Sequence, residues 1–251
     1  MDLLGQAAGW LADPSHWAGS NGVPVRLIEH VTLSGLTVVV GMAVALPLGL
    51  AIGHTGRGAL LAINLANLGR AIPSYALLLV LFPVFGLGFA TAFPALLLLT
   101  LPPILTNTYI GIREVDRDMV DAGRGMGMGS LQILARVEIP IALPFIVAGI
   151  RTAAVQVVAT ATLAALVAGG GLGRFIVDGF ALQDHGQLLA GGLLVAGLAI
   201  TTEHLLAAVE RRITSPGLRI AAPPAGRAPP GDRVHAGRPG LHVVLRGERL
   251  R

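Results

Sequence analysis

The side chains that could do chemistry are few in this chain, and their spacing excludes several kinds of site. All eighteen basic residues are arginine, and neither lysine nor cysteine occurs. This excludes thiol nucleophiles, disulfides, Schiff-base chemistry and the lysine of a phosphate-binding loop. Histidines occur at positions 16, 30, 54, 185, 204, 235 and 242, never at the spacing at which a helix presents two metal ligands. We predict no catalytic residue, no metal site, no cofactor in this chain and no enzymatic activity.

Several polar residues are notable because they lie inside long apolar stretches. A charge at membrane depth usually faces the helix bundle or a wet cavity, although a long arginine can also extend to the headgroups. Hydroxyl groups and a glycine-rich turn could line a solute pathway, but helix packing would explain each residue singly as well. The candidates for intramembrane or pathway positions are Arg70, Tyr75, Arg151, Thr160, Thr162 and Gly170.

The segment Asp121–Pro144 is polar and rich in glycine, and it lies between two apolar runs. No charge occurs from Ala71 to Ile112 ahead of it, and Arg151 is the only charge between Glu138 and Arg174 behind it. An ion at the centre of a bilayer costs about 3 kcal/mol on insertion scales. The segment must therefore be a loop of a membrane protein that lies outside the hydrocarbon.

The pattern inside this segment predicts a compact protrusion. Residues 115–124 can form a short helix that begins among three aspartates, where the helix dipole favours anions. Four alternating glycines (positions 123, 125, 127 and 129) then break that helix. Ser130 is a candidate N-cap for a second helix, which Pro140 and Pro144 should end. The alternatives are a plain flexible connection or a phosphate-binding loop, but the GxxxxGK[ST] pattern of the latter is missing.

The spacing of seven residues in this segment resembles the EAA loop of ABC importer permeases. That loop has Glu-Ala-Ala, three residues, Gly, nine residues, then Ile-x-Leu-Pro; this chain has Asp for Glu, Gly for the second Ala, Val for Ile and Ile for Leu. The resemblance implies that the loop inserts into a cleft on a separate ATPase subunit, which binds the ATP. The matching residues are Asp121, Ala122, Gly123, Gly127, Val137, Ile139 and Pro140.

A wider resemblance over residues 27–212 points to the osmoprotectant branch of these permeases, through segments 71–78, 121–129, 142–153 and 159–173. It implies a permease subunit for glycine betaine, carnitine or choline. The implied partners are an ABC ATPase, an extracytoplasmic solute-binding protein and a second permease copy or sister permease. The alternatives are a permease for another small solute, such as an amino acid or related betaine, or a membrane-embedded enzyme or sensor.

The chain itself offers little for recognition of a quaternary ammonium ion. Such an ion is usually held by an aromatic cage. Only four residues are Trp or Tyr (Trp10, Trp17, Tyr75 and Tyr109), and they do not cluster in the sequence. We therefore expect high-affinity recognition to reside in the separate binding protein.

Composition predicts the elements that position these residues. The chain of 251 residues is 53% hydrophobic and 13% charged, with a mean hydropathy of +0.73. Runs of about 18 or more uncharged residues indicate membrane-spanning helices. We predict an all-α integral membrane protein, and the resemblance implies the five-helix type I ABC importer transmembrane domain with a cytoplasmic EAA-type coupling loop at 113–140. The expected spans are 31–53, 58–85, 92–112, 141–168 and 187–208; Gly49 and Gly53 should form a packing face in the first.

The second span is ambiguous because it contains Arg70 and Pro73. Either one long helix is broken at Pro73, which we favour, or residues 58–69 lie at the membrane interface. In the first case Arg70 lies in the membrane.

The flanks and the charges predict an orientation. Residues 1–26, with Trp10 and Trp17, should be an extracytoplasmic or interfacial segment, residues 27–212 the transmembrane domain, and residues 213–251 a disordered cytoplasmic tail. Arginines are concentrated on the side of the 113–140 loop, which places the loop and the C-terminus in the cytoplasm and the N-terminus outside. We expect the plasma (inner) membrane of a prokaryote. The pI near 10.9 reflects arginines in the loops and the tail, which report orientation in the lipid bilayer rather than binding to nucleic acid.

Overall fold

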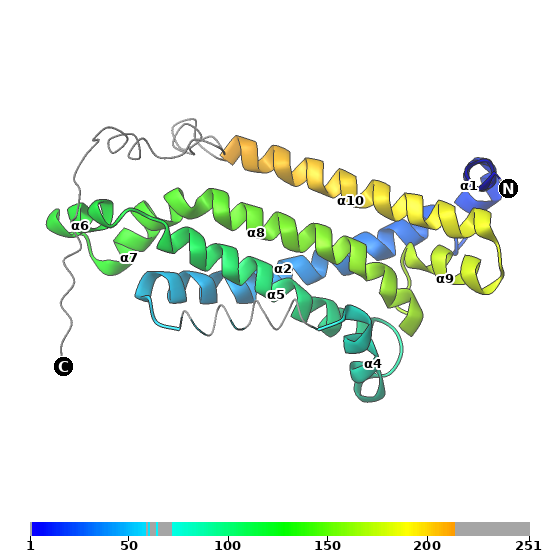
Figure 1. The fold of residues 1–251 in the computed structure, drawn as a ribbon, viewed down its shortest axis with the longest axis horizontal. Coiled ribbons are helices and arrows are strands. Elements are labelled where there is room, and N and C mark those ends of the chain that lie inside the picture. Colours follow the sequence, from blue (N-terminus) through cyan, green and yellow to red (C-terminus); the bar gives the residue numbers. More distant parts are fainter. Residues whose placement is uncertain (1, 59, 61–63, 65–71, 214–251) are drawn as a thin grey trace, which may run out of the picture. The chain divides into compact units, whose positions relative to one another are not determined.

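The structure is a computed structural model that describes residues 2–58, 60, 64 and 72–213. The described elements are all helical (Figure 1). In chain order they are α1 (Leu3–Ala12), η1 (Pro14–Trp17), α2 (Val23–Thr55), α4 (Ser74–Phe85), α5 (Phe89–Arg113), α6 (Arg117–Gly125), α7 (Ser130–Ile133), η2 (Leu134–Glu138), α8 (Ile139–Thr160), η3 (Ala161–Val167), α9 (Gly173–Ala181) and α10 (His185–Ile213).

Four of the described helical stretches are apolar and long enough to cross a membrane. They are α2 with 33 residues, α5 with 25, the continuous stretch Ser130–Val167 with 38, and α10 with 29. At 1.5 Å per residue, even 25 residues reach beyond the roughly 30 Å of a bilayer's hydrocarbon core. Helix α4 is apolar but has only 12 residues. Five spans therefore stay a prediction.

The predicted span 58–85 is described only in its second half. Helix α4 begins directly after Pro73, whose backbone is extended, so the chain is not helical through that proline. The choice between a broken helix and an interfacial segment depends on residues 59–71, most of which lie outside the described part of the chain. Arg70 lies outside it as well.

The segment before the first span is more structured than the sequence indicated. Helix α2 begins at Val23 rather than near residue 31, because Gly22 is the N-cap and Pro24 lies in the first turn, where a missing N–H costs nothing. Helix α1 precedes it and buries Ala7 and Trp10 against α9 and α10, beside Phe175. The predicted division at residue 26 stays untested as a domain boundary.

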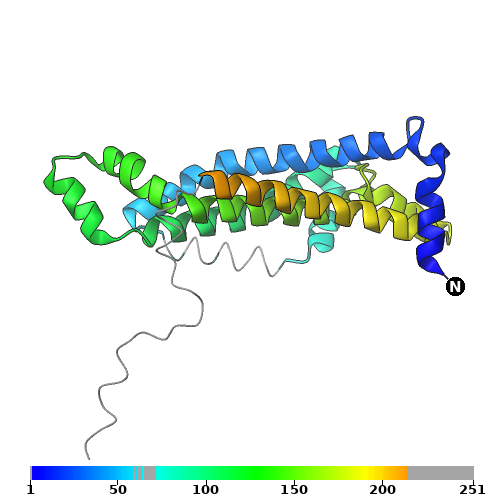
Figure 2. The ribbon, with the colours of Figure 1, turned by 90° about the horizontal axis from the view of Figure 1, so that it is seen from above.

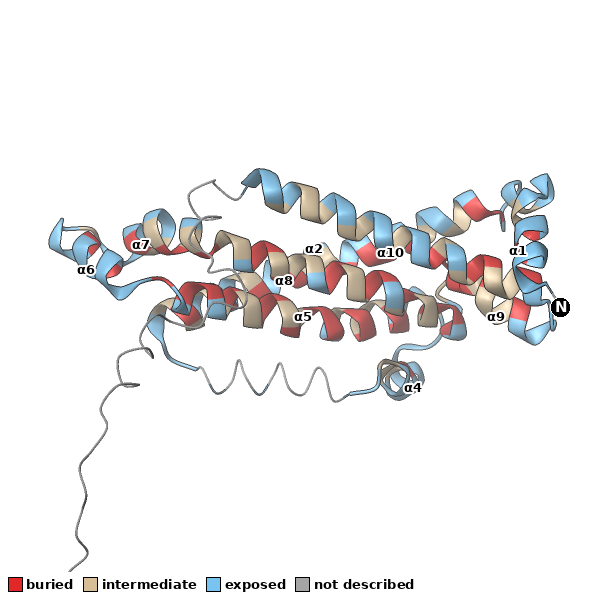
Figure 3. Ribbon diagram, turned by 45° about the horizontal axis from the view of Figure 1, so that its top comes forward, coloured by how far each residue is buried: buried red, intermediate tan, exposed pale blue. Residues whose placement is uncertain are grey.

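Helices α2 and α5 pack closely through glycines of α2. A Cβ atom at Gly41 would lie 2.6 Å from Thr100, one at Gly49 would lie 2.8 Å from Thr108, and one at Gly53 would lie 2.7 Å from Ile112. The predicted packing face at Gly49 and Gly53 is thus the contact of α2 with α5. Figure 3 shows buried residues concentrated along α5 and α8, whereas α10 is mostly intermediate or exposed.

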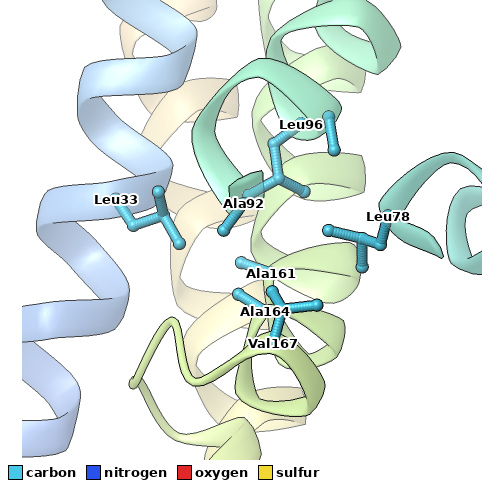
Figure 4. Close-up of a cluster of buried hydrophobic side chains, with 8 residues drawn as sticks. Leu33, Leu78, Ala92, Leu96, Ala161, Ala164 and Val167 are labelled. Carbon is cyan, nitrogen blue, oxygen red and sulfur yellow. The ribbon is translucent and has the colours of Figure 1, made fainter. Parts of the chain in front are cut away.

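The end of this bundle near α4 has an apolar core of its own. Side chains from α2, α4, α5 and η3 meet there (Figure 4), and the 3-10 turn η3 contributes three of them. The buried residues are Leu33, Leu78, Ala92, Ala95, Leu96, Ala161, Ala164 and Val167.

The direction of the long helices determines where the predicted loop lies. Helices α2 and α5 run toward α6 and α7, and α8 runs back from them, so α6 and α7 lie at one end of the bundle (Figures 1 and 2). Helices α1 and α9 lie at the opposite end. The segment 113–140 and the N-terminal helix are therefore at opposite ends of the bundle.

Candidate functional site

The first helix of the loop forms where the aspartates predict it. Asp116 is the N-cap of α6, and its carboxylate accepts a hydrogen bond from the Asp118 N–H at 2.9 Å. Asp118 in the first turn and Arg124 in the last turn both suit the helix dipole. The expected range 115–124 differs from α6 by two residues at its start and one at its end.

Only one of the four glycines makes the elbow. Gly123 and Gly125 remain inside α6, whereas Gly127 has a φ of +80°, a left-handed conformation that L side chains rarely adopt. The Gly127 N–H donates to the Arg124 carbonyl at 2.9 Å and the Met128 N–H to the Gly123 carbonyl at 3.1 Å. This is the Schellman arrangement that ends many helices. A Cβ at Gly127 would meet nothing within 4 Å, so backbone conformation rather than space demands the glycine.

The second helix differs from its prediction at both ends. Gly129, not Ser130, is the N-cap, and its N–H donates to the Gln132 side-chain oxygen at 2.9 Å. The chain then stays helical through Pro140, because a π-helical turn, η2, leads directly into α8. In this turn the Ile139 N–H bonds to the Leu134 carbonyl five residues back. Pro140, the second residue of α8, has no N–H to donate to the preceding turn, and the wider π-helical turn directly before it lets the helix continue.

The loop has a small apolar core that holds its two helices together. Val115, Val120 and Ile133 are buried in it, with Met128 packed against them. Gly123 is buried beside this core, and a Cβ there would lie 3.5 Å from the Met128 sulfur, an ordinary contact distance. The EAA pattern has an alanine at this position, and an alanine side chain would fit here beside the core.

The outer surface of the loop combines charge with exposed apolar side chains. Asp121 and Ala122 are exposed, and the Asp121 carboxylate pairs with Arg124 at 2.9 Å in a solvated contact of little energetic weight. Three large apolar side chains are also exposed on this surface. They are Met119, Met126 and Leu131, which are 50%, 76% and 77% exposed; the sequence pattern did not single them out. Pro140 is exposed, while Val137 and Ile139 are half-buried.

Sequence reasoning missed a contact between the loop and the end of α2. Nδ1 of His54 lies 2.5 Å from a carboxylate oxygen of Glu138, and Nε2 lies 2.6 Å from the Ser130 hydroxyl. Glu138 is only 3% exposed. His54 precedes its two partners by 84 and 76 residues, and Glu138 occupies the variable position of the Ile-x-Leu-Pro pattern, so no local signal identifies the contact.

The predicted pathway residues fall into separate places. Thr160 and Thr162 lie where α8 becomes the 3-10 turn η3, and each hydroxyl donates to a carbonyl of the preceding turn. Thr162 also lines an apolar cavity of about 280 Å³ between η3, α9 and the start of α10. Gly170 lies in the turn after η3, and Tyr75 is half-exposed at the start of α4.

Arg151 has two carboxylate partners on α10. Its guanidinium lies 3.1 Å from Glu210 and 3.5 Å from Glu203, which are two helical turns apart. Glu203 therefore faces Arg151 of α8. Sequence spacing could not show this contact between two distant helices.

At the opposite end of the bundle, side chains of α2 hold the glycine-rich turn between η3 and α9. The Glu29 carboxylate accepts from the Gly171 N–H at 2.8 Å and from Arg26 at 2.7 Å. His30 is fully buried, with one ring nitrogen 2.8 Å from the Val158 carbonyl and the other 3.3 Å from the Leu172 N–H. Among the residues that the structure describes, no three His, Asp or Glu side chains gather as metal ligands.

The comparisons with known proteins agree with this architecture. The family profile described as "Binding-protein-dependent transport system inner membrane component" matches residues 39–215. The glycine betaine/carnitine/choline transport system permease protein OpuCB of Bacillus subtilis is 39% identical over 191 residues, which cover 76% of this chain and 88% of the relative. The choline transport system permease protein OpuBB of the same organism is 38% identical, covering 77% and 89%. The carnitine transport permease protein OpuCB of Listeria monocytogenes is 39% identical, covering 78% and 90%.

Solved structures share the fold at low sequence identity. A chain of the inward-facing MetNI methionine ABC transporter superposes with a TM-score of 0.70 at 22% identity, over 81% of this chain and all of that one. A chain of an amino acid ABC transporter crystallised with histidines gives a TM-score of 0.65 at 18% identity, covering 84% and 99%. The predicted fold class, an all-helical transmembrane domain of the ABC importer type, is thereby confirmed.

Proposed function

The chain belongs to the family of inner membrane components of binding-protein-dependent transport systems, and from this premise we propose that it is the permease subunit of an ABC importer for a small osmoprotectant such as glycine betaine, carnitine or choline. The proposed solute class rests on sequence identity: the chain is 38–39% identical, over about three quarters of its length, to permeases named for these solutes. The structural neighbours, at 22% identity or less, support the fold and not the solute.

The 113–140 loop is the element that we propose docks into the ATPase. Its Schellman elbow and its own apolar core make it a folded unit rather than a flexible connection. Met119, Met126 and Leu131 offer apolar contact area, beside the exposed carboxylate of Asp121. ATP is bound and hydrolysed by the partner, and closure of two ATPase subunits moves the loops of two permeases, either identical copies or sisters.

The orientation we propose places this loop in the cytoplasm. The loop and the N-terminal helix lie at opposite ends of the bundle, and Arg113, Arg117, Arg124 and Arg136 lie on the loop side. The N-terminus is then extracytoplasmic, and the solute-binding protein docks on the side of α1 and α9.

Recognition of the solute is proposed to occur mainly in the binding protein. Trp10 is stacked on His16 at 4.0 Å and has its edge against Phe175 at 5.2 Å, so its ring already has partners. Tyr75 lies on α4 and Tyr109 on α5, half-buried against α2 and α8 side chains. These aromatic residues form no cage for a quaternary ammonium ion.

Uptake by the reconstituted transporter tests this proposal. The chain is produced with its ATPase and binding protein in proteoliposomes, and uptake of radiolabelled glycine betaine, carnitine and choline is compared with that of methionine and histidine. We expect ATP-dependent uptake of at least one of the first three solutes and none of the amino acids. Uptake of an amino acid and of none of the three osmoprotectants would contradict the proposed solute class but not the transport function. ATP hydrolysis by the purified chain alone would contradict its assignment as a permease subunit.

A further inference from the structure

His54 lies where the last turn of α2 meets the loop, and it is the one side chain of α2 with recorded hydrogen bonds to that loop in the described residues. Its two ring nitrogens contact two different parts of the loop. Nδ1 reaches Glu138 in the π-helical turn η2, and Nε2 reaches Ser130 at the start of α7. One imidazole thus joins both ends of the second loop helix to α2.

The buried carboxylate makes this contact energetically significant. Glu138 is 3% exposed, and a buried carboxylate is strongly destabilising unless it is paired and hydrogen-bonded. An ionised carboxylate can only accept, so Nδ1 of His54 carries the proton and donates it to Glu138. The Ser130 hydroxyl can donate to or accept from Nε2, so it satisfies the second nitrogen in either protonation state of the ring. Separation of α2 from η2 would leave the Glu138 charge buried without its partner.

The rest of the loop is held differently. The core under the loop is made by loop residues and by Ile141 at the start of α8, and α7, η2 and α8 are one continuous helical stretch. These contacts keep the loop in one piece and attach it to α8. Leu134 and Ile139 also share an apolar cluster with Leu46 and Leu50 of α2. The bonds of His54 add the polar attachment of the loop to α2.

We propose that His54 is a positioning residue that fixes the coupling loop to α2, so that a movement of the loop is passed to α2 as well as to α8. This inference rests on the proposed function, because it assigns His54 a role in coupling. Helix α2 carries Glu29 and His30 at its other end, where they hold the glycine turn after η3. Movement of α2 therefore reaches the extracytoplasmic side of the pathway.

The decisive variant removes the contact without leaving a buried charge. In His54→Ala/Glu138→Gln an uncharged amide replaces the buried carboxylate, so the protein should insert and fold, yet the polar attachment to α2 is lost. We expect solute taken up per ATP hydrolysed to fall about tenfold in the reconstituted transporter, a size typical of coupling between distant sites. Amide hydrogen exchange of residues 130–138 in the purified permease should accelerate.

A conservative variant and a matched histidine serve as controls. His54→Asn keeps a donor near the position of Nδ1 and should retain most of the uptake per ATP of the wild type. His204→Asn changes an exposed histidine of α10 and should leave the uptake per ATP unchanged. A double variant that inserts normally and retains both wild-type uptake per ATP and wild-type exchange would overturn the role of His54. If the unaltered transporter takes up none of the three solutes, the proposed solute class fails instead, and the exchange measurement still decides whether His54 holds the loop.

Discussion

At the scale of single residues, Gly127 shows how one backbone conformation shapes the loop. Its φ of +80° allows the two hydrogen bonds that end α6, and its missing side chain leaves open space. The sequence predicts a break in the helix at four alternating glycines. The structure assigns the break to the backbone conformation of Gly127, and this determines which substitutions should be tolerated.

Gly127→Val should be harmful and Gly127→Asn much less so. A β-branched residue in the left-handed region costs about 1–3 kcal/mol, whereas asparagine visits that region more readily. The loop of the valine variant should therefore change shape, and ATP-dependent uptake should fall several-fold while the amount of inserted protein stays normal. Uptake in proteoliposomes and membrane content on immunoblots measure the two effects.

Gly125→Ala is the matched control for this pair. Gly125 is helical and has nothing within 4 Å of its Cβ position, so alanine should leave uptake intact. Equal uptake by the valine and asparagine variants would show that the conformation of the elbow is unimportant for coupling.

At the scale of elements, the turn between η3 and α9 depends on its contact with α2. Gly170 and Gly171 have φ angles of +75° and +78°, and the Gly171 N–H donates to Glu29. A Cβ at Gly170 would lie 2.5 Å from a Glu29 carboxylate oxygen. Gly170 was singled out from the sequence as a pathway residue, and its position beside Glu29 suggests a role in packing the turn.

Gly170→Ala should weaken this end of the bundle. The left-handed backbone and the displaced Glu29 side chain should together lower the stability by about 1–3 kcal/mol. We expect a lower melting temperature of the detergent-purified permease, followed by fluorescence of Trp10 and Trp17, and reduced uptake. Gly192→Ala on α10, where a Cβ would meet nothing within 4 Å, is the control and should melt like the wild type. A wild-type melting temperature for Gly170→Ala would contradict the role of the turn.

At the scale of the whole molecule, the opposed positions of the loop and α1 lead to a topology that can be measured. A reporter that is active only in the cytoplasm should work when it is fused after Arg124 and fail when it is fused after Asp178 on α9. Reporter activity at Asp178 would contradict the orientation. A reporter after Arg219 should also be active, and that position lies outside the described residues.

The loop contains features that the sequence alone predicts and one that it does not. Asp116, Gly127 and the spacing to Pro140 act through their own backbone or through neighbours in the chain, so their pattern alone predicted a helix, an elbow and a second helix. The continuous helix through Pro140 was not predicted, because the π turn that accommodates it has no reliable sequence signal.

The sequence by itself determined the class of protein, the apolar stretches and the loop, since these follow from hydropathy and from local backbone preferences. Only the tertiary structure decided the partners of the charged side chains: His54 with Glu138, Arg151 with Glu203 and Glu210, and Glu29 with Gly171. Each of these contacts joins segments that are far apart in the chain. A buried charge requires a partner, but the helix that supplies the partner is set by how the bundle packs, and that packing is not encoded in any local spacing.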